Sequence, residues 1–167
     1  MKKKKLLILD KEKIAHKLRR MAFEIWELNA NEDAITLVGV EKGGKTVADV
    51  LGGILQEISP LKIEVLSVSI NKRNPLNHAL TFEDNLTDRA VVIVDDVANS
   101  GKTLAYSLHA LLSYDLRKVM VAVLVDRKHK SFPIACDIVG QTLATTIQEH
   151  IEVEISDKSI NAVYLTE

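Results

Sequence analysis

One strand–turn–helix segment constrains the fold of this chain more than any other. Residues 91–96 read Val-Val-Ile-Val-Asp-Asp, and the β-branched run favours a strand buried on both faces of a parallel sheet. The apolar helical spacing of Leu104, Tyr106, Leu108 and Leu111 begins only a few residues later. A buried parallel strand that leads directly into a helix is typical of an α/β fold.

Polar residues at the end of this strand and in the turn after it predict a ligand site. Ligands of open α/β sheets bind beyond the carboxyl ends of the strands, and anions bind the N-termini of helices. The segment therefore places two carboxylate acceptors for sugar hydroxyls beside backbone N–H groups for a phosphate, a pairing that suits a phosphorylated ribose. The candidate residues are Asp95, Asp96, Asn99, Ser100, Gly101, Lys102 and Thr103.

A purely structural role for Asp95 and Asp96, in helix capping and turn formation, is the alternative interpretation. Two neighbouring carboxylates repel each other, and the cost is greatest when no ligand compensates their charge. Their position beside a phosphate-binding turn therefore favours a ligand site over a role in the turn alone.

Strand and helix alternate along the rest of the chain. Residues 11–29 have the apolar spacing of a helix, whereas residues 71–89 are polar, contain Pro75 and indicate a long loop or a poorly formed hairpin. This alternation predicts a mainly parallel sheet with helices on both faces, and an irregular tail over one edge. Further strands are expected at 34–40, 61–70 and 119–126, with short candidates at 136–139, 151–155 and 162–165. Further helices are expected from Gly43 to about Leu55 and from Thr103 to about Tyr114.

Composition and charge limit the classes of protein to which this chain can belong. The chain has 167 residues, 47% of them hydrophobic, which is enough for one globular domain with a full core. Its formal net charge of −1 provides no global field that favours nucleic acid or membrane. The lone Cys136 excludes an internal disulfide, and no apolar run is long enough to span a bilayer. The apolar run after lysines 2–5 is too short for a signal peptide, so we interpret these lysines as a solvated tail of a cytoplasmic protein.

Residues 39–46, Gly-Val-Glu-Lys-Gly-Gly-Lys-Thr, fit a second phosphate motif, the P-loop of nucleoside triphosphatases. Under that hypothesis residues 91–96 would supply the strand and acidic residue that hold Mg²⁺. The hypothesis leaves the phosphate-binding turn after Asp96 without a role. It also makes Gly39 a loop residue, although Gly39 lies within an apolar strand pattern. A P-loop nucleotide kinase is therefore a rival, and so is a plain βα turn without a ligand.

The segment 91–103 resembles the signature with which type I phosphoribosyltransferases bind 5-phosphoribosyl-1-pyrophosphate (PRPP). That signature is a hydrophobic strand, Asp-Asp, any three residues, and then Ser or Thr, Gly, any residue and Thr. Within that family, the chain resembles the bifunctional pyrimidine operon regulators with uracil phosphoribosyltransferase activity. This similarity includes residues 8–10, 37–40, 123–129, 133–134 and 137–140. The Lys42-Gly43-Gly44 turn is more similar to the hypoxanthine–guanine branch.

The resemblance implies a fold and a reaction. The fold is a mainly parallel five-stranded sheet flanked by helices, with a small irregular C-terminal hood, in a single domain of residues 1–167. The reaction transfers ribose 5-phosphate from PRPP to a nucleobase, with uracil or another pyrimidine as the expected base, and releases pyrophosphate. The expected cofactor is Mg²⁺, bound mainly through PRPP and not by a metal site of the protein. A homodimer or higher homo-oligomer is also expected.

The resemblance also implies roles for the candidate residues. Asp95 and Asp96 would hold the ribose hydroxyls and stabilise the cationic sugar, and residues 99–103 would wrap the 5′-phosphate. Residues 42–44 would form the pyrophosphate turn, where family members often carry a non-proline cis peptide. Arg127 would read the exocyclic carbonyl of the base, with a surface ion pair after a strand as its alternative interpretation.

Three departures from the family pattern bear on the base and on catalysis. Gly43 stands where the regulators have an arginine in the pyrophosphate turn. Asn99 stands where purine enzymes have an acidic residue near the base, and an amide cannot act as a general base at neutral pH. Ile147 stands where purine enzymes stack an aromatic ring on the base. A regulator that binds PRPP or a nucleotide without catalysis is therefore the second hypothesis, followed by a purine phosphoribosyltransferase and then the P-loop kinase.

RNA binding is a separate hypothesis, because the resembled regulators bind messenger RNA. The first helix has a basic side, but acidic residues dilute it and the net charge is not basic. The basic residues on this helix are Lys11, Lys13, His16, Lys17, Arg19 and Arg20.

Overall fold

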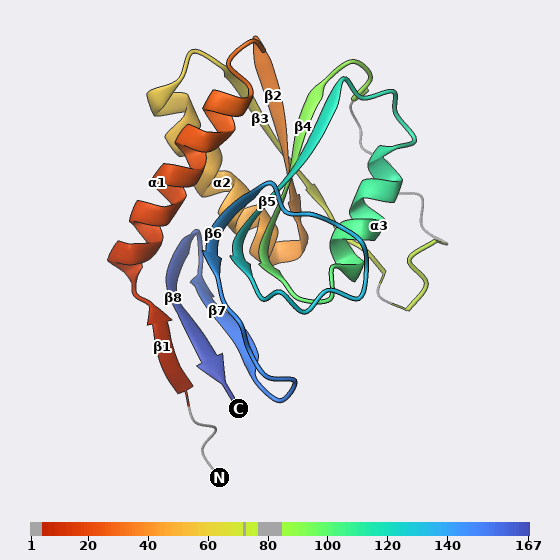
Figure 1. Cartoon of the computed structure of the whole chain (residues 1–167). Coiled ribbons are helices and arrows are strands. Elements are labelled where there is room, and N and C mark those ends of the chain that lie inside the picture. The colour runs from red at the N-terminus through yellow and green to blue at the C-terminus, as the bar shows by residue number, and fades with distance from the viewer. Residues whose placement is uncertain (1–4, 72, 77–84) are drawn as a thin grey trace.

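The computed structural model describes residues 5–71, 73–76 and 85–167, and its main feature is a five-stranded sheet (Figure 1). The strands are β2 (Ala34–Val40), β3 (Lys62–Val68), β4 (Ala90–Ala98), β5 (Lys118–Asp126) and β6 (Ile138–Thr142). Their order is β3-β2-β4-β5-β6, and each neighbouring pair is parallel. The expected sheet is confirmed, with the acidic pair on its central strand.

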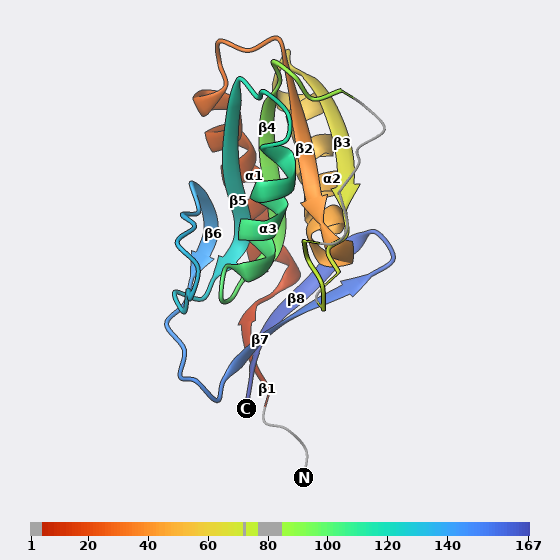
Figure 2. The ribbon, with the colours of Figure 1, turned by 90° about the vertical axis from the view of Figure 1, so that its right-hand side faces the viewer.

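Helices cover both faces of this sheet, as expected (Figure 2). They are α1 (Lys11–Leu28), α2 (Glu41–Ile58) and α3 (Lys102–Leu111). The first two lie on one face and α3 lies on the other. Alternate residues of β4 fit this arrangement, because Val92 and Val94 belong to the apolar cluster with α1 and α2, whereas Val91 and Ile93 belong to the cluster with α3.

The C-terminal part of the chain is more regular than the hood that we expected. It supplies two strands of a separate antiparallel sheet, β7 (His150–Ser156) and β8 (Ser159–Thr166), which β1 (Lys5–Leu9) completes in the order β1-β8-β7. Side chains of β7 alternate between exposed and half-buried, as in a strand covered on one face. The short strands expected near 136–139, 151–155 and 162–165 correspond to β6, β7 and β8.

Two element boundaries near the predicted ligand site differ from the expectation. The strand β4 continues past Asp96 to Ala98, because its last residues still pair with β5. The helix α2 begins at Glu41, earlier than Gly43, so it follows β2 without an intervening turn. Both differences bring the polar residues into regular structure and so define their positions more closely.

Two predicted segments lie partly outside the described residues. Of the predicted loop 71–89, residues 72 and 77–84 lie outside the described residues, and the remainder contains no helix or strand. Lysines 2–4 of the predicted tail also lie outside them, whereas Lys5 begins β1. Within the described ranges, no helix is long and apolar enough to cross a membrane.

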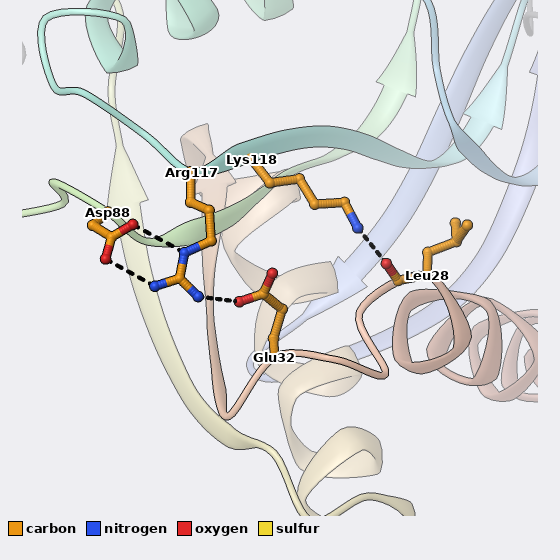
Figure 3. Close-up of polar contacts among 5 residues, drawn as sticks. All are labelled: Leu28, Glu32, Asp88, Arg117 and Lys118. Carbon is orange, nitrogen blue, oxygen red and sulfur yellow. Dashed lines mark hydrogen bonds and ion pairs between the residues drawn. The ribbon is translucent and has the colours of Figure 1, made fainter.

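The edge of the main sheet at the amino ends of its strands carries paired charges (Figure 3). The guanidinium of Arg117 donates to Glu32 at 2.9 Å and to both carboxylate oxygens of Asp88, and the Lys118 ammonium donates to the Leu28 carbonyl. A hollow of about 410 Å³ at this edge includes Glu32, Asp88 and Arg117 in its wall. Because these charged groups already bind partners within the protein, the opposite, carboxyl edge is the stronger candidate for a ligand site.

Candidate functional site

The acidic pair lies at the carboxyl end of the central strand β4. Asp95 is 8% exposed and Asp96 is half-buried. Oδ1 of Asp95 accepts the backbone N–H of Asp96 at 2.9 Å, and Oδ1 of Asp96 accepts that of Val97 at 2.8 Å. Burial, followed by the nearby charges of Asp96 and Glu41, raises the pKa of Asp95 well above its usual range. A buried carboxyl held among other carboxylates is typical of a site that a positively charged or hydroxyl-bearing ligand completes.

The residues after β4 form a small pocket at the N-terminus of α3. Its volume is about 60 Å³, and its wall consists of Asp95 and residues 97–104. Gly101 has a left-handed φ of 78°, and a Cβ at this residue would lie 2.8 Å from the side chain of Ile134. Only glycine fits both the conformation and the space. The first N–H groups of a helix have no partner within it, so this turn suits a phosphate.

Residues 42–44 lie beside the acidic pair, in the first turn of α2. All peptide bonds of the described residues are trans, so the cis peptide implied by the resemblance is not present in this turn. A Cβ on Gly43 would lie 2.6 Å from Cγ of Asp96, which places the helix N-terminus directly against the carboxylate. Lys42 is exposed and forms no ion pair within the described residues. The structure therefore brings residues 42–44 and the acidic pair together, as predicted.

The geometry of residues 39–46 argues against a P-loop. Gly39 is a residue of β2, and a Cβ there would lie 2.7 Å from the backbone nitrogen of Lys45. Since α2 begins at Glu41, no loop is left between strand and helix to wrap a phosphate chain. The ammonium of Lys45 pairs with Asp49 in the next turn of the helix. The glycine pattern of this segment is explained by close packing of helix on strand.

Arg127 lies buried between the turn after β4 and the segment that precedes β7. It is 8% exposed. Its Nε donates to the Thr145 hydroxyl at 2.5 Å, its Nη2 to the Thr146 carbonyl at 2.8 Å, and its Nη1 to Oδ1 of Asn99 at 3.4 Å. Among the described residues these partners are all uncharged, so the structure does not support a surface ion pair for Arg127. The structure instead places Arg127 against Asn99 in the predicted phosphate turn.

Several residues that build this site were not anticipated from the sequence. The carboxylate of Glu41 accepts the backbone N–H of Ile70 at 2.8 Å and so links the segment just after β3 to the first turn of α2. A charged residue directly after a strand was the available signal for Glu41. The carbonyl of Ser100 accepts the backbone N–H of Ser131 at 2.9 Å. Because this contact involves only backbone atoms, the residue types gave no indication of it. The threonines that hold Arg127 lie in a segment without periodicity, where no signal was available.

Internal contacts use part of the basic side of α1. Nη2 of Arg20 donates to the carbonyls of Val139 and Gly140 at 2.9 Å and 2.8 Å. Arg19 pairs with Glu57 at 3.6 Å. The RNA hypothesis therefore depends on the remaining basic residues of this helix, because Arg20 docks α1 against β6.

A metal site made by protein side chains alone is not found in the part of the chain that the structure describes. Within it, no group of three or more His, Cys, Asp or Glu residues is placed to hold an ion. A metal at the carboxyl edge would need ligands from a bound molecule in addition to the carboxylates of β4.

Comparisons with known proteins agree with this geometry. The family model described as phosphoribosyl transferase domain matches residues 7–158. The chain belongs to this phosphoribosyltransferase family. It is 34% identical over 161 residues to the bifunctional protein PyrR of Fusobacterium nucleatum, covering 90% of this chain and 91% of that protein. It is 31% identical over 170 residues to the bifunctional protein PyrR of a Roseiflexus species, covering 95% and 93%. The family resemblance of the sequence is thereby confirmed.

Solved phosphoribosyltransferases share the fold of this family member. The hypoxanthine phosphoribosyltransferase of Trypanosoma cruzi matches with a TM-score of 0.79 at 15% identity, covering 93% of this chain and 94% of that one. The Leishmania tarentolae enzyme solved in complex with GMP matches with a TM-score of 0.74 at 17% identity, covering 85% and 83%. These likenesses confirm the predicted five-stranded fold.

Proposed function

We propose that this phosphoribosyltransferase family member transfers ribose 5-phosphate from PRPP to a pyrimidine base, with uracil as the first candidate. The observation that carries the proposal is that buried Asp95 lines the same pocket as the phosphate-binding turn of α3. Family membership supports the reaction type. The resemblance to pyrimidine operon regulators, and the similarity to proteins named bifunctional protein PyrR, support a pyrimidine.

In this reaction the bond from C1 of the ribose to a pyrophosphate oxygen breaks, and its electron pair leaves with pyrophosphate. A ring nitrogen of the base forms the new bond to C1, and the proton of that nitrogen passes to pyrophosphate or to water. The sugar is positively charged in the transition state, so carboxylates beside it lower the barrier. A positive charge next to Asp95 favours the ionised form that burial and Asp96 disfavour in the free protein.

Two helix N-termini would hold the two ends of PRPP. The first turn of α3, with the hydroxyls of Ser100 and Thr103, would bind the 5′-phosphate. The first turn of α2, with the exposed ammonium of Lys42, would bind pyrophosphate. Gly43 leaves room for Asp96 at this turn, which an arginine would not. The two anionic ends would thus flank the acidic pair that faces the sugar.

Magnesium fits this donor set as an ion held mainly by PRPP. Mg²⁺ prefers one or two carboxylates together with substrate phosphates and water. Asp95 and Asp96 are the residues that would contact it. The ion would neutralise charge on the leaving pyrophosphate.

Arg127 would bind a carbonyl oxygen of the base. Its guanidinium is held by Thr145 and Thr146, so its direction is set before the base arrives. Ile147, which follows these threonines, is 87% exposed and would cover one face of the base.

We also propose, from the family resemblance, that residues 1–167 form a single domain that acts in the cytoplasm as a homodimer or higher homo-oligomer. Light scattering on the purified protein tests the assembly directly. A mass of at least two chains supports this part of the proposal, and the mass of one chain contradicts it.

The test of the proposed function is calorimetric titration with PRPP and Mg²⁺, alongside ATP and Mg²⁺ and an assay of uracil turnover. We expect PRPP binding that Asp95→Asn abolishes and that Asp115→Asn, a matched change at an exposed residue, preserves. ATP binding without PRPP binding would overturn the proposal. PRPP binding without turnover of any base would favour a non-catalytic regulator, the second hypothesis.

A further inference from the structure

The carboxylate of Asp126, at the end of β5, is buried and bound at both oxygens. Only 3% of its side chain is exposed. Oδ1 accepts the backbone N–H of Lys128 at 3.0 Å, and Oδ2 accepts from the Lys130 ammonium at 3.2 Å. Lys128 has a left-handed φ of 63°, which is uncommon for lysine, and the contact with Oδ1 closes a turn around it. Asp126 therefore fixes the course of the exit segment, residues 128–134, as the chain leaves β5.

The exit segment packs against the predicted phosphate turn. The backbone N–H groups of Ser131 and Phe132 both donate to the carbonyl of Ser100, at 2.9 Å and 3.1 Å. The side chain of Ile134 fills the space beside Gly101 that a Cβ would otherwise take. Backbone and side-chain contacts thus join the segment that Asp126 holds to the turn between β4 and α3.

The two hydrogen bonds to Ser100 set the direction of the peptide group between Ser100 and Gly101. In a trans peptide the C=O and the N–H point in opposite directions, and this peptide is trans. Because the exit segment holds the carbonyl, the Gly101 N–H is turned to the other side of the peptide. This N–H has no hydrogen-bond partner among the described residues, and Gly101 lines the pocket at the N-terminus of α3. It is therefore a donor available to an anion in that pocket.

We propose that Asp126 is a positioning residue for the 5′-phosphate, because its carboxylate holds the segment that points the Gly101 N–H into the phosphate pocket. This inference rests on the proposed function and adds a residue that does not touch the substrate. The ammonium groups of Lys128 and Lys130 lie 4.0 Å and 3.2 Å from Oδ2 and compensate its charge, which limits repulsion of a nearby phosphate.

Loss of the carboxylate should weaken phosphate binding in particular. The Lys128 N–H and the Lys130 ammonium would lose their acceptor, and the left-handed turn would lose the contact that closes it. The exit segment would then hold the Ser100 carbonyl less firmly. A phosphate would have to order the Gly101 N–H on binding and would lose the advantage of a preorganised donor.

Calorimetric titration with two probes tests this inference. Ribose 5-phosphate reports on the phosphate pocket, and pyrophosphate with Mg²⁺ reports on the turn of α2. In Asp126→Ala we expect the Kd for ribose 5-phosphate to rise about tenfold or more, as a lost charged hydrogen bond would cause, with the Kd for pyrophosphate unchanged. Asp137→Ala is the matched control, because Asp137 accepts the backbone N–H of Val121 at 2.8 Å, next to the start of β6. This control should leave both values unchanged.

Asp126→Asn provides a second variant, nearly identical in shape, in case the alanine variant does not fold. Its amide oxygen can still accept the Lys128 N–H, but its NH₂ group meets the Lys130 ammonium, donor against donor. Its Kd for ribose 5-phosphate should lie between those of the wild type and Asp126→Ala. Unchanged binding of ribose 5-phosphate in the folded Asp126 variants overturns this inference alone, and so does equal weakening of both probes. A wild-type protein that does not bind ribose 5-phosphate overturns the proposed function, and this inference with it.

Discussion

Gly44 lies so close to Val94 that no side chain fits between them. A Cβ at residue 44 would overlap the carbonyl oxygen of Val94 and would lie 3.0 Å from Cα of Asp95. The backbone of α2 therefore rests directly on the backbone of β4 at the point where the acidic pair begins. This contact sets the distance between the predicted pyrophosphate turn and the predicted ribose carboxylates.

We predict that Gly44→Ala disrupts the site, because the clash is with backbone atoms that cannot turn away. The expected cost is about 1–3 kcal/mol of unfolding free energy, together with loss of PRPP binding. Gly53→Ala, in the middle of the same helix, is the matched control because nothing lies within 4 Å of its Cβ. That change should stabilise the protein by up to about 1 kcal/mol. Urea denaturation measures both, and equal stability of the two variants would contradict the prediction.

We predict that Asp95→Asn makes the free protein more stable at neutral pH while it abolishes activity. Burial and the charge of Asp96 raise the pKa of Asp95, so the folded protein binds this proton more tightly than the unfolded chain. The contribution of this group to stability is then greatest at acid pH and falls as pH rises above the ordinary aspartate pKa. Melting temperatures from pH 3 to pH 8 should show an advantage of the variant at pH 7 that vanishes near pH 3. A less stable variant at pH 7 would refute this prediction.

Asp88→Asn should change stability at neutral pH in the opposite direction to Asp95→Asn. Nε and Nη2 of Arg117 donate to the two carboxylate oxygens at 3.0 Å and 2.8 Å, and this contact lowers the pKa of Asp88 (Figure 3). The stabilisation is present above the ordinary aspartate pKa and is lost as pH falls through the lowered value. The variant should melt slightly lower at pH 7, with no difference at strongly acid pH. Because both groups are exposed, the difference should shrink in 1 M salt. A salt-independent difference would point to a cause other than this ion pair.

Residues close together in the chain made the local structure around the acidic pair predictable, namely a strand, a turn and a helix N-terminus. The strand, the carboxylates and the helix N-terminus all lie within residues 91–103, and the pattern of each is local. The position of Gly39 was likewise predictable, because its apolar neighbours indicated a strand. The structure confirms this by placing Gly39 in β2.

Contacts between distant residues were not predictable in the same way. The strand β1 pairs with β8, at the other end of the chain, and residues 6–9 alone gave no sign of that partner. Arg127 was predicted to lie near the site, but Thr145, which orients it, follows in a segment with no helical or strand period. In both cases the stabilising partner depends on tertiary packing, which a single sequence does not display.

The contact of Glu41 with Ile70 yields a final prediction about how the carboxyl edge is held together. Glu41 has a left-handed φ of 55°, an uncommon conformation for glutamate, and its carboxylate accepts the Ile70 backbone N–H at 2.8 Å. Removing the acceptor leaves that half-buried N–H unpaired. In Glu41→Ala we therefore expect the Ile70 amide to exchange with deuterated water about tenfold faster or more.

Glu41→Gln separates the hydrogen bond from the charge. Its amide oxygen can still accept from Ile70, so slow exchange at this amide should be retained, although the negative charge near Asp95 is removed in both variants. Hydrogen exchange resolved at residue 70 distinguishes the two, with amides of α1 as the internal reference. Equally fast exchange in the Gln and Ala variants would show that charge on Glu41, and not its acceptor, holds the segment that follows β3. Unchanged exchange in both would show that this contact does not protect Ile70.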